Sequence, residues 1–68
     1  MKLNLRRIKF LNMVNDKKEY IDTKGRDNPD KSMIHDLWIA GILNKETPFE
    51  NVWKYTLTDK GRRKIGRN

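Results

Sequence analysis

The fold of this chain is decided by residues 54–62, which read KYTLTDKGR. Tyr55 and Leu57 are two positions apart, so they fall on the same face of a strand. Thr58 follows and can accept a hydrogen bond from the free backbone N–H groups of a helical turn. The aspartate after it lies in that first turn, where negative charge is favoured. Gly61 lets neighbouring atoms come close. We therefore expect a strand that passes directly into a capped helix.

The residues on either side of this stretch extend the pattern. Residues 52–57 alternate, with Trp53 on the same face as the tyrosine and leucine, and with Lys54 on the opposite face. Residues 44–51 are polar and contain a proline, which predicts a hairpin loop. Residues 58–67 are rich in lysine and arginine, which predicts a short basic helix or tail.

Two longer helices are expected before the hairpin. Over residues 3–15 an apolar stripe has helical spacing, and it consists of Leu3, Phe10, Leu11 and Val14. Leu5 and Met13 fall outside this stripe, which leaves two alternatives: a homodimer contact, or partly exposed side chains. The second helix is expected from Pro29 to Gly41, with Asn28 as its cap. Trp38 and Trp53 could stack on unpaired bases, but we assign both to the core.

The interval between these helices, residues 16–30, is polar and is expected to be irregular. Residues 19–23 alternate and favour a short strand. Residues 24–29 are dense in turn formers, which predicts a loop.

Composition limits the class of protein. The chain has 68 residues, so we expect one domain over residues 1–68 with a small core. It has no cysteine, hence neither disulfides nor thiolate metal sites, and His35 is its one histidine. No recognisable catalytic spacing is present, so we expect neither enzyme activity nor a cofactor. No apolar run approaches the length of about 20 residues that spans a bilayer, and we expect a cytoplasmic protein without a membrane partner.

The net charge is +7, which suits a polyanion. The charge is unevenly distributed: residues 1–18 carry +5, residues 19–50 carry −3 and residues 51–68 carry +5. Two basic ends therefore flank an acidic middle.

Two motifs are informative when they are taken together. The first is Ile34-x-x-Leu37-x-x-x-Gly41-Ile42-Leu43, and the second is Tyr55-Thr56-Leu57-Thr58-Asp59-Lys60-Gly61. Together they resemble the winged-helix family of DNA-binding domains, of small bacterial or phage type. The first motif is similar to the end of a recognition helix and the next strand, and the second is similar to the return strand of the wing and its cap. The resemblance implies a compact α+β winged helix with two main helices, a β-hairpin wing and a short C-terminal basic helix or tail. The polar interval departs from the family, which has another helix there; either that helix is reduced to a turn, or residues 19–23 replace it.

The resemblance implies a small protein that binds double-stranded DNA as a transcriptional regulator, with the second helix in the major groove. It makes Ile39 a candidate contact to a thymine methyl and Lys45 a candidate phosphate contact on the wing. The other nucleic-acid-binding candidates are Arg6, Arg7, Lys31, Ser32, His35, Lys54, Lys60, Arg62, Arg63, Lys64 and Arg67.

The layout of the acidic residues favours an alternative. Asp30 and Asp36 lie on or beside the presumed reading helix, and Glu46 and Glu50 lie at the wing. A carboxylate near a phosphate weakens binding. Two resolutions remain open: the basic ends pack side by side to form the DNA-facing patch, or the protein is an interaction module that binds a protein partner through Ile39, Phe49 and the acidic middle. Association with RNA or the ribosome is a further alternative.

Overall fold

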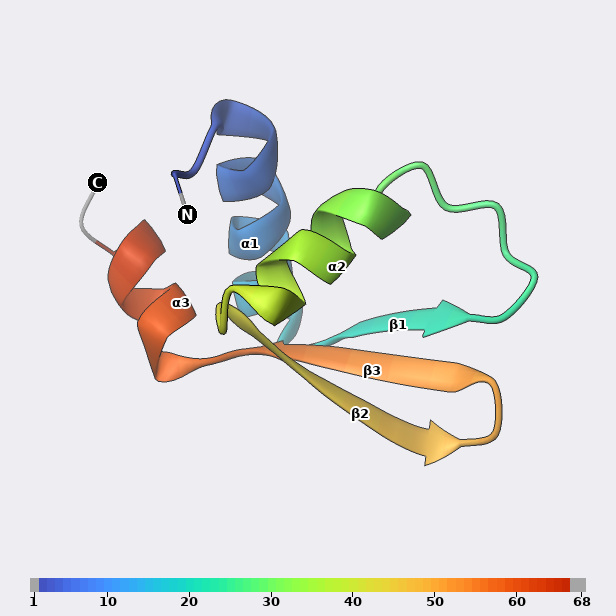
Figure 1. Ribbon diagram of the computed structural model, residues 1–68. Coiled ribbons are helices and arrows are strands. Elements are labelled where there is room, and N and C mark those ends of the chain that lie inside the picture. The colour runs from blue at the N-terminus through green and yellow to red at the C-terminus, as the bar shows by residue number, and fades with distance from the viewer. Residues whose placement is uncertain (1, 67–68) are drawn as a thin grey trace.

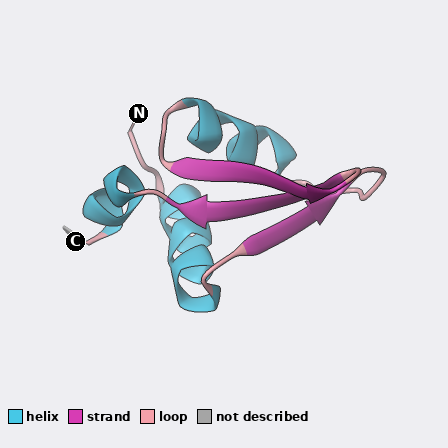
Figure 2. Cartoon of the chain, turned by 90° about the horizontal axis from the view of Figure 1, so that it is seen from below, coloured by secondary structure: helices cyan, strands magenta, loops and turns pink. Residues whose placement is uncertain are grey.

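The computed structural model describes residues 2–66, whose elements are α1 (Leu5–Lys17), β1 (Tyr20–Thr23), α2 (Lys31–Ile39), β2 (Leu43–Phe49), β3 (Val52–Leu57) and α3 (Asp59–Ile65). The strands form one antiparallel sheet in the order β1-β3-β2. Helices α1 and α2 cover one face of this sheet, and α3 lies beside α1 at the end of the sheet (Figure 1; Figure 2). The expected compact α+β class is confirmed: this part of the chain has three helices and a three-stranded sheet.

The core lies between the helices and the sheet. Phe10, Leu11 and Val14 of the predicted stripe are buried, and Leu3 packs against them at the edge. The other buried apolar residues come from α2, the hairpin and the turn between them: Met33, Ile34, Leu37, Ile42, Leu43, Tyr55 and Leu57. Leu5 is exposed and Met13 is half-buried. Of the two alternatives for this pair, partly exposed side chains therefore describe their positions in the single chain.

Helix α1 begins and ends with well-defined caps. The Asn4 side chain accepts a hydrogen bond from the Arg7 backbone N–H at 2.9 Å. The helix ends where Lys18 adopts a left-handed conformation with φ 73°. Because α1 reaches Lys17, the expectation of irregular structure from residue 16 is wrong by two residues. The expected short strand is confirmed as β1. The loop expected at residues 24–29 is also present and extends to residue 30, so the interval contains no second helix.

Helix α2 is shorter than predicted at both ends. The Asn28 carboxamide oxygen accepts the Asp30 N–H at 2.9 Å, so it orders the turn before the helix; the N-cap position itself belongs to Asp30. At the other end Gly41 has φ +78°, and its N–H donates to Trp38 O at 3.0 Å. A Cβ on Gly41 would meet nothing closer than 3.9 Å. Gly41 therefore stops the helix through its backbone conformation and not by tight packing.

The predicted hairpin loop at residues 44–51 is wrong. Strand β2 continues to Phe49, and the turn is Glu50–Asn51, with Asn51 at φ 62°. Pro48 is tolerated for two reasons. Strand β2 is an edge strand, and the register shifts between Glu46 and Phe49, so a missing N–H does not break a regular ladder.

The junction between β3 and α3 matches the expectation from residues 54–62. The Thr58 hydroxyl oxygen accepts the Gly61 N–H at 3.0 Å and donates to Gly41 O at 2.7 Å. The Thr58 N–H donates to Ile42 O at 3.1 Å. Gly61 is buried, and a Cβ there would lie 2.5 Å from both Ile42 O and Leu57 Cδ2. The absence of a side chain at residue 61 therefore allows α3 to contact the α2–β2 turn.

We predict that Gly61→Ala destabilises the fold by about 1–3 kcal/mol, because the methyl group would overlap a backbone carbonyl that cannot rotate away. This loss outweighs the gain in helix propensity from glycine to alanine, about 1 kcal/mol. Urea unfolding followed by circular dichroism measures it. The matched control is Arg63→Ala, an exposed position in the same helix, which should change stability by no more than about 0.5 kcal/mol. Equal stability of the Gly61 variant and the wild type would contradict the close contact.

We also predict that Thr58→Ala lowers the free energy of unfolding by about 1–2 kcal/mol, since it removes the acceptor for the Gly61 N–H. Thr58→Ser keeps the hydroxyl and should retain most of the stability. The same unfolding experiment compares the two variants, and similar losses in both would show that the methyl group, not the cap, matters.

Candidate nucleic-acid interface

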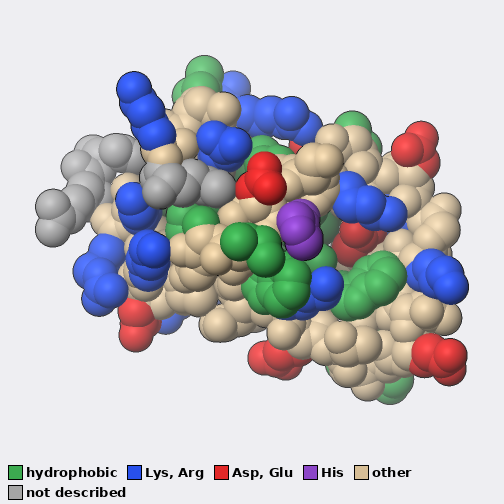
Figure 3. All heavy atoms as spheres, in the orientation of Figure 1, with side chains coloured by type: hydrophobic (Ala, Val, Ile, Leu, Met, Phe, Trp, Pro, Cys, Tyr) green, Lys and Arg blue, Asp and Glu red, His purple; other side chains and the backbone are tan. Residues whose placement is uncertain are grey.

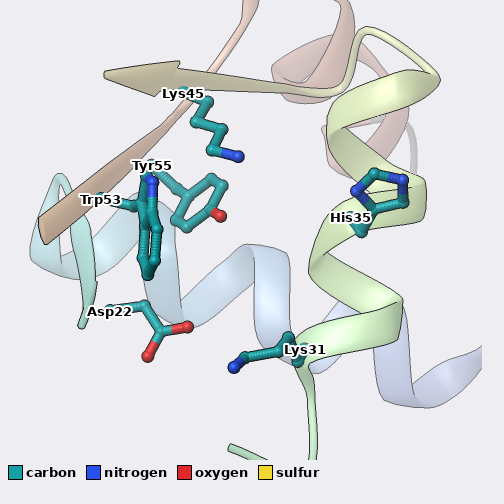
Figure 4. A pocket seen from close by; sticks show the side chains of 6 residues that line it. All are labelled: Asp22, Lys31, His35, Lys45, Trp53 and Tyr55. Carbon is teal, nitrogen blue, oxygen red and sulfur yellow. The ribbon is translucent and has the colours of Figure 1, made fainter. Parts of the chain in front are cut away.

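A hollow of about 180 Å³ lies between α2 and the sheet. Its lining residues come from α2 and all three strands: Asp22, Lys31, His35, Lys45, Trp53 and Tyr55. Figure 4 shows the side chains of Trp53 and Tyr55 on the sheet side, with the Tyr55 hydroxyl directed into the space in front of α2. In the space-filling view, hydrophobic, lysine or arginine, and histidine side chains gather on this face (Figure 3).

Strand alternation and register determine the sheet side of the hollow. Asp22 is directly opposite Trp53, and Lys45 is directly opposite Tyr55, so the four side chains share one face of the sheet. The Asp22 side chain is almost fully buried, with 3% of the residue exposed. Its Oδ1 accepts the Thr23 N–H at 3.0 Å. Asp22 forms no ion pair with another residue of the described chain.

Helical spacing determines the opposite side. Lys31, His35 and Trp38 are four and three positions apart, so they lie on one face of α2. The rings of His35 and Trp38 meet edge to face, with centroids 5.7 Å apart. The assignment of Trp38 to the core is wrong, because 37% of this residue is exposed. Its neighbours Ile34 and Leu37 already fill the core beneath α2, and Trp38 lies one position beyond that stripe.

Lys45 lies next to both tryptophans. Its Nζ is 4.5 Å from the centroid of the Trp38 ring and 5.7 Å from the centroid of the Trp53 ring. At an exposed site each such cation–π contact stabilises by about 0.5–1 kcal/mol. Trp53 is half-buried and packs against the core, which agrees in part with its predicted place.

Burial raises the pKa of the Tyr55 hydroxyl above its ordinary value of 10.0. The negative charge of Asp22 is the second-largest cause of this increase in pKa, and Tyr20 is the third. Because the phenol holds its proton more tightly than a free tyrosine does, it is a hydrogen-bond donor in the hollow throughout the neutral pH range.

The basic residues of α1 lie near the start of α2. Arg6 donates to Pro29 O at 3.1 Å and forms an ion pair with Asp30 at 2.6 Å. Arg7 is half-buried, and its guanidinium donates to Lys2 O at 3.1 Å. These arginines share a shallow depression with Asn4, Ser32, Met33 and Asp36. Ser32 and Asp36 therefore face the first turn of α1, whereas Lys31 and His35 face the hollow.

Two of the predicted basic residues of α3 hold the fold together. Lys60 Nζ donates to Ala40 O at 2.9 Å, at the end of α2. Arg62 pairs with Asp59 at 2.7 Å and its other nitrogen lies 3.5 Å from Leu57 O. The hydrogen bond from Arg62, followed by its charge, lowers the pKa of Asp59. Arg63 is exposed, Lys64 is half-buried, and Arg67 lies outside the described residues.

Lys54 lies apart from the other predicted residues. Alternation along β3 places it opposite the Trp53 and Tyr55 face, on the side of the sheet that the helices do not cover (Figure 2). There it pairs with Glu46 of β2 at 3.9 Å. The predicted set is thus divided among the hollow, the α1–α2 depression, α3 and the outer face of the sheet.

Sequence reasoning missed Asp22 and Tyr55 as lining residues of a site. The strand expected at residues 19–23 contained a signal for Asp22, because Tyr20 and Asp22 are two apart and share a face. Nothing in the sequence indicated that α2 would stand far enough from the sheet to leave a hollow.

Comparison with known proteins found no matching family model, curated protein or solved structure. Within residues 2–66, no helix is long and apolar enough to cross a membrane. The same residues contain no group of three or more histidine, aspartate or glutamate side chains arranged to hold a metal ion.

We predict that Tyr55 ionises above pH 10.0. The variant Tyr20→Phe leaves Tyr55 as the one tyrosine, so an ultraviolet titration reads its pKa directly. Adding Asp22→Asn should bring the midpoint down, because a negative neighbour is removed. The folded state binds this proton more tightly than the unfolded chain does. Its stabilisation is therefore complete below pH 10 and is lost as the pH rises through the folded-state pKa. A midpoint at or below 10.0 in Tyr20→Phe would be inconsistent with a buried hydroxyl.

Proposed function

We propose that this protein binds nucleic acid, with double-stranded DNA as its main ligand, and that it is a small winged-helix protein acting as a transcriptional regulator. The observation that carries the proposal is the packing of α3 against α1. Helix α1 carries Arg6, Arg7, Lys9 and Lys17, and α3 carries Lys60, Arg62, Arg63 and Lys64. Their contact brings these basic residues onto neighbouring helices, and lysine and arginine side chains gather there (Figure 3). A phosphate backbone is the polyanion that such a surface attracts most strongly.

The order of the elements supports the winged-helix part of the proposal. In such a domain α2 would be the reading helix and the β2–β3 hairpin the wing. The additional helix of the family is replaced here by β1 and the loop at residues 24–30. Lys31 and His35 are exposed on α2 and have the hydrogen-bonding groups that contact base edges.

The ion pairs account for several of the acidic residues that oppose DNA binding. Asp30 pairs with Arg6, Glu46 pairs with Lys54, and Asp59 pairs with Arg62. Asp36 faces α1 and not the hollow. Glu46 and Glu50 still lie along the hairpin, so we place the DNA against α2 and the α1–α3 surface, with the outer face of the sheet turned away.

Two exposed apolar side chains support the second candidate function, a module that binds a protein partner. Ile39 is 66% exposed at the end of α2, and Phe49 is 73% exposed at the end of β2. Their exposure suits an apolar contact, whereas the charge of the α1–α3 surface is better explained by DNA.

We predict that binding to random-sequence duplex DNA weakens steeply as salt increases, and that Arg63→Ala reduces the slope of log K against log salt by about 1. The control Lys54→Ala removes the same charge from the outer face of the sheet and should leave the slope unchanged. Fluorescence anisotropy of a labelled duplex measures both variants. Absence of duplex binding at low salt would exclude this function, and equal slopes for both variants would place the DNA elsewhere.

A further inference from the structure

The Asp22 carboxylate has no role in the duplex contact proposed above. It is almost fully buried, and no lysine or arginine of the described chain lies within ion-pair distance. One of its oxygens, Oδ1, accepts the Thr23 N–H. The other oxygen is not one of the buried side-chain atoms of residues 2–66 that lack a hydrogen-bond partner. Because Asp22 lines the hollow, this second oxygen is accessible there and can accept a hydrogen bond from a donor that arrives from outside.

The sheet side of the hollow is aromatic, because Trp53 and Tyr55 stand there. Trp38 is not a lining residue, but it lies at the edge of the site: the Lys45 ammonium is beside both the Trp38 and the Trp53 rings. Flat aromatic faces bind the flat face of a nucleobase by stacking. The lysine side chain is long and rotatable, and its contacts with the two rings are weak enough to be exchanged for contact with a phosphate.

The charged groups of the hollow disfavour a ligand that carries only a positive charge and a ligand that carries only a negative charge. Lys31 and Lys45 line the hollow with positive charge, so a lysine or arginine side chain from a partner would be repelled. A free phosphate would be repelled by Asp22 once inside. A ligand that satisfies the whole site has an aromatic plane, an edge with hydrogen-bond donors, and a negative charge outside that edge. A nucleotide has all three.

We propose that the hollow binds an unpaired guanine base of a nucleic-acid strand, with Asp22 accepting from the N1–H and the 2-amino group and with Lys31 and Lys45 contacting the flanking phosphates. Guanine presents two adjacent donors on its Watson–Crick edge, which match the two oxygens of a carboxylate. Thymine would direct two carbonyl oxygens beside its single N–H toward Asp22. In a duplex this edge is paired, so the base must be unpaired or turned out of the stack. The site deepens the nucleic-acid-binding function proposed above by adding recognition of an exposed base.

The ligand itself provides the sharpest test, because the protein then stays unchanged. Three single-stranded DNA pentamers differ only at the central base: guanine, hypoxanthine or thymine, flanked by thymines. Hypoxanthine is guanine without the 2-amino group. Quenching of tryptophan fluorescence at low salt measures binding. We expect the guanine pentamer to bind about tenfold more tightly than the thymine pentamer, with hypoxanthine in between. Equal affinities for guanine and thymine would overturn the proposal.

Protein variants test which residues are responsible. Asp22→Asn keeps an acceptor for the Thr23 N–H but replaces the second oxygen by an NH₂ donor, so the preference for guanine should disappear while binding to the thymine pentamer is retained. Persistence of the preference in this variant would overturn the role of Asp22. Trp38→Ala should weaken binding to all three pentamers by about tenfold. The control Phe49→Ala removes an exposed aromatic ring outside the hollow and should leave the affinities unchanged; equal losses in both would also overturn the site.

Duplex binding measured on the same preparation separates the two proposals. If the duplex binds and the three pentamers do not differ, the base site fails and the duplex function stands. If neither duplex nor pentamer binds, both fail.

Discussion

The close approach of α3 to the turn between α2 and β2 is the constraint on which the rest of the structure depends. Gly61 has no side chain, so the first turn of α3 reaches the Ile42 carbonyl, where a Cβ would lie only 2.5 Å away. Thr58 adds hydrogen bonds on both sides of this contact, to the Gly61 N–H and to Gly41 O. Lys60 adds a third link, to Ala40 O. The end of α2 and the start of α3 are therefore fixed to each other, although Thr58 and Gly41 are 17 positions apart in the sequence. In a chain with so small a core, local links of this kind carry a large share of the stability.

This constraint has consequences for the distribution of charge. Helix α3, fixed to the α2–β2 turn, also packs against α1, so the basic residues of the two helices lie on neighbouring elements. The same turn sets the direction in which β2 leaves α2, and so the gap between α2 and the sheet in which Asp22, Trp53 and Tyr55 lie. Under the two proposals above, phosphates would contact the α1–α3 surface and a base would contact the hollow. The junction between α3 and the α2–β2 turn orients both surfaces. A basic helix alone would bind any polyanion, whereas a carboxylate beside aromatic side chains would add discrimination among ligands.

The sequence predicted the parts of the fold that depend on local chemistry. The strand at residues 52–57, the Thr58 cap and the need for a glycine at residue 61 are each determined by neighbouring residues, and all are present. The hairpin loop was mispredicted because of Pro48. Proline disrupts a strand only where a neighbouring strand needs its backbone N–H, and the sequence does not show that β2 lies at the edge of the sheet, since that depends on how all the strands pair. Trp38 was placed in the core for a similar reason, since helical spacing does not say how much space lies beneath the helix. The candidate site could be predicted only in part: Lys31 and His35 were identified from their places on α2, but Asp22 and Tyr55 join them through strand pairing between distant segments.

We propose that DNA binds to the surface formed where α3 packs against α1. The measurement that tests it most directly is a nuclear magnetic resonance titration of the labelled protein with duplex DNA, in which backbone amide shifts report the contact surface residue by residue. We expect the largest shifts in α1, α2 and α3, and little change at Ile21, Glu46 and Lys54 on the outer face of the sheet. Large shifts confined to that outer face, with α1 and α3 unchanged, would contradict it.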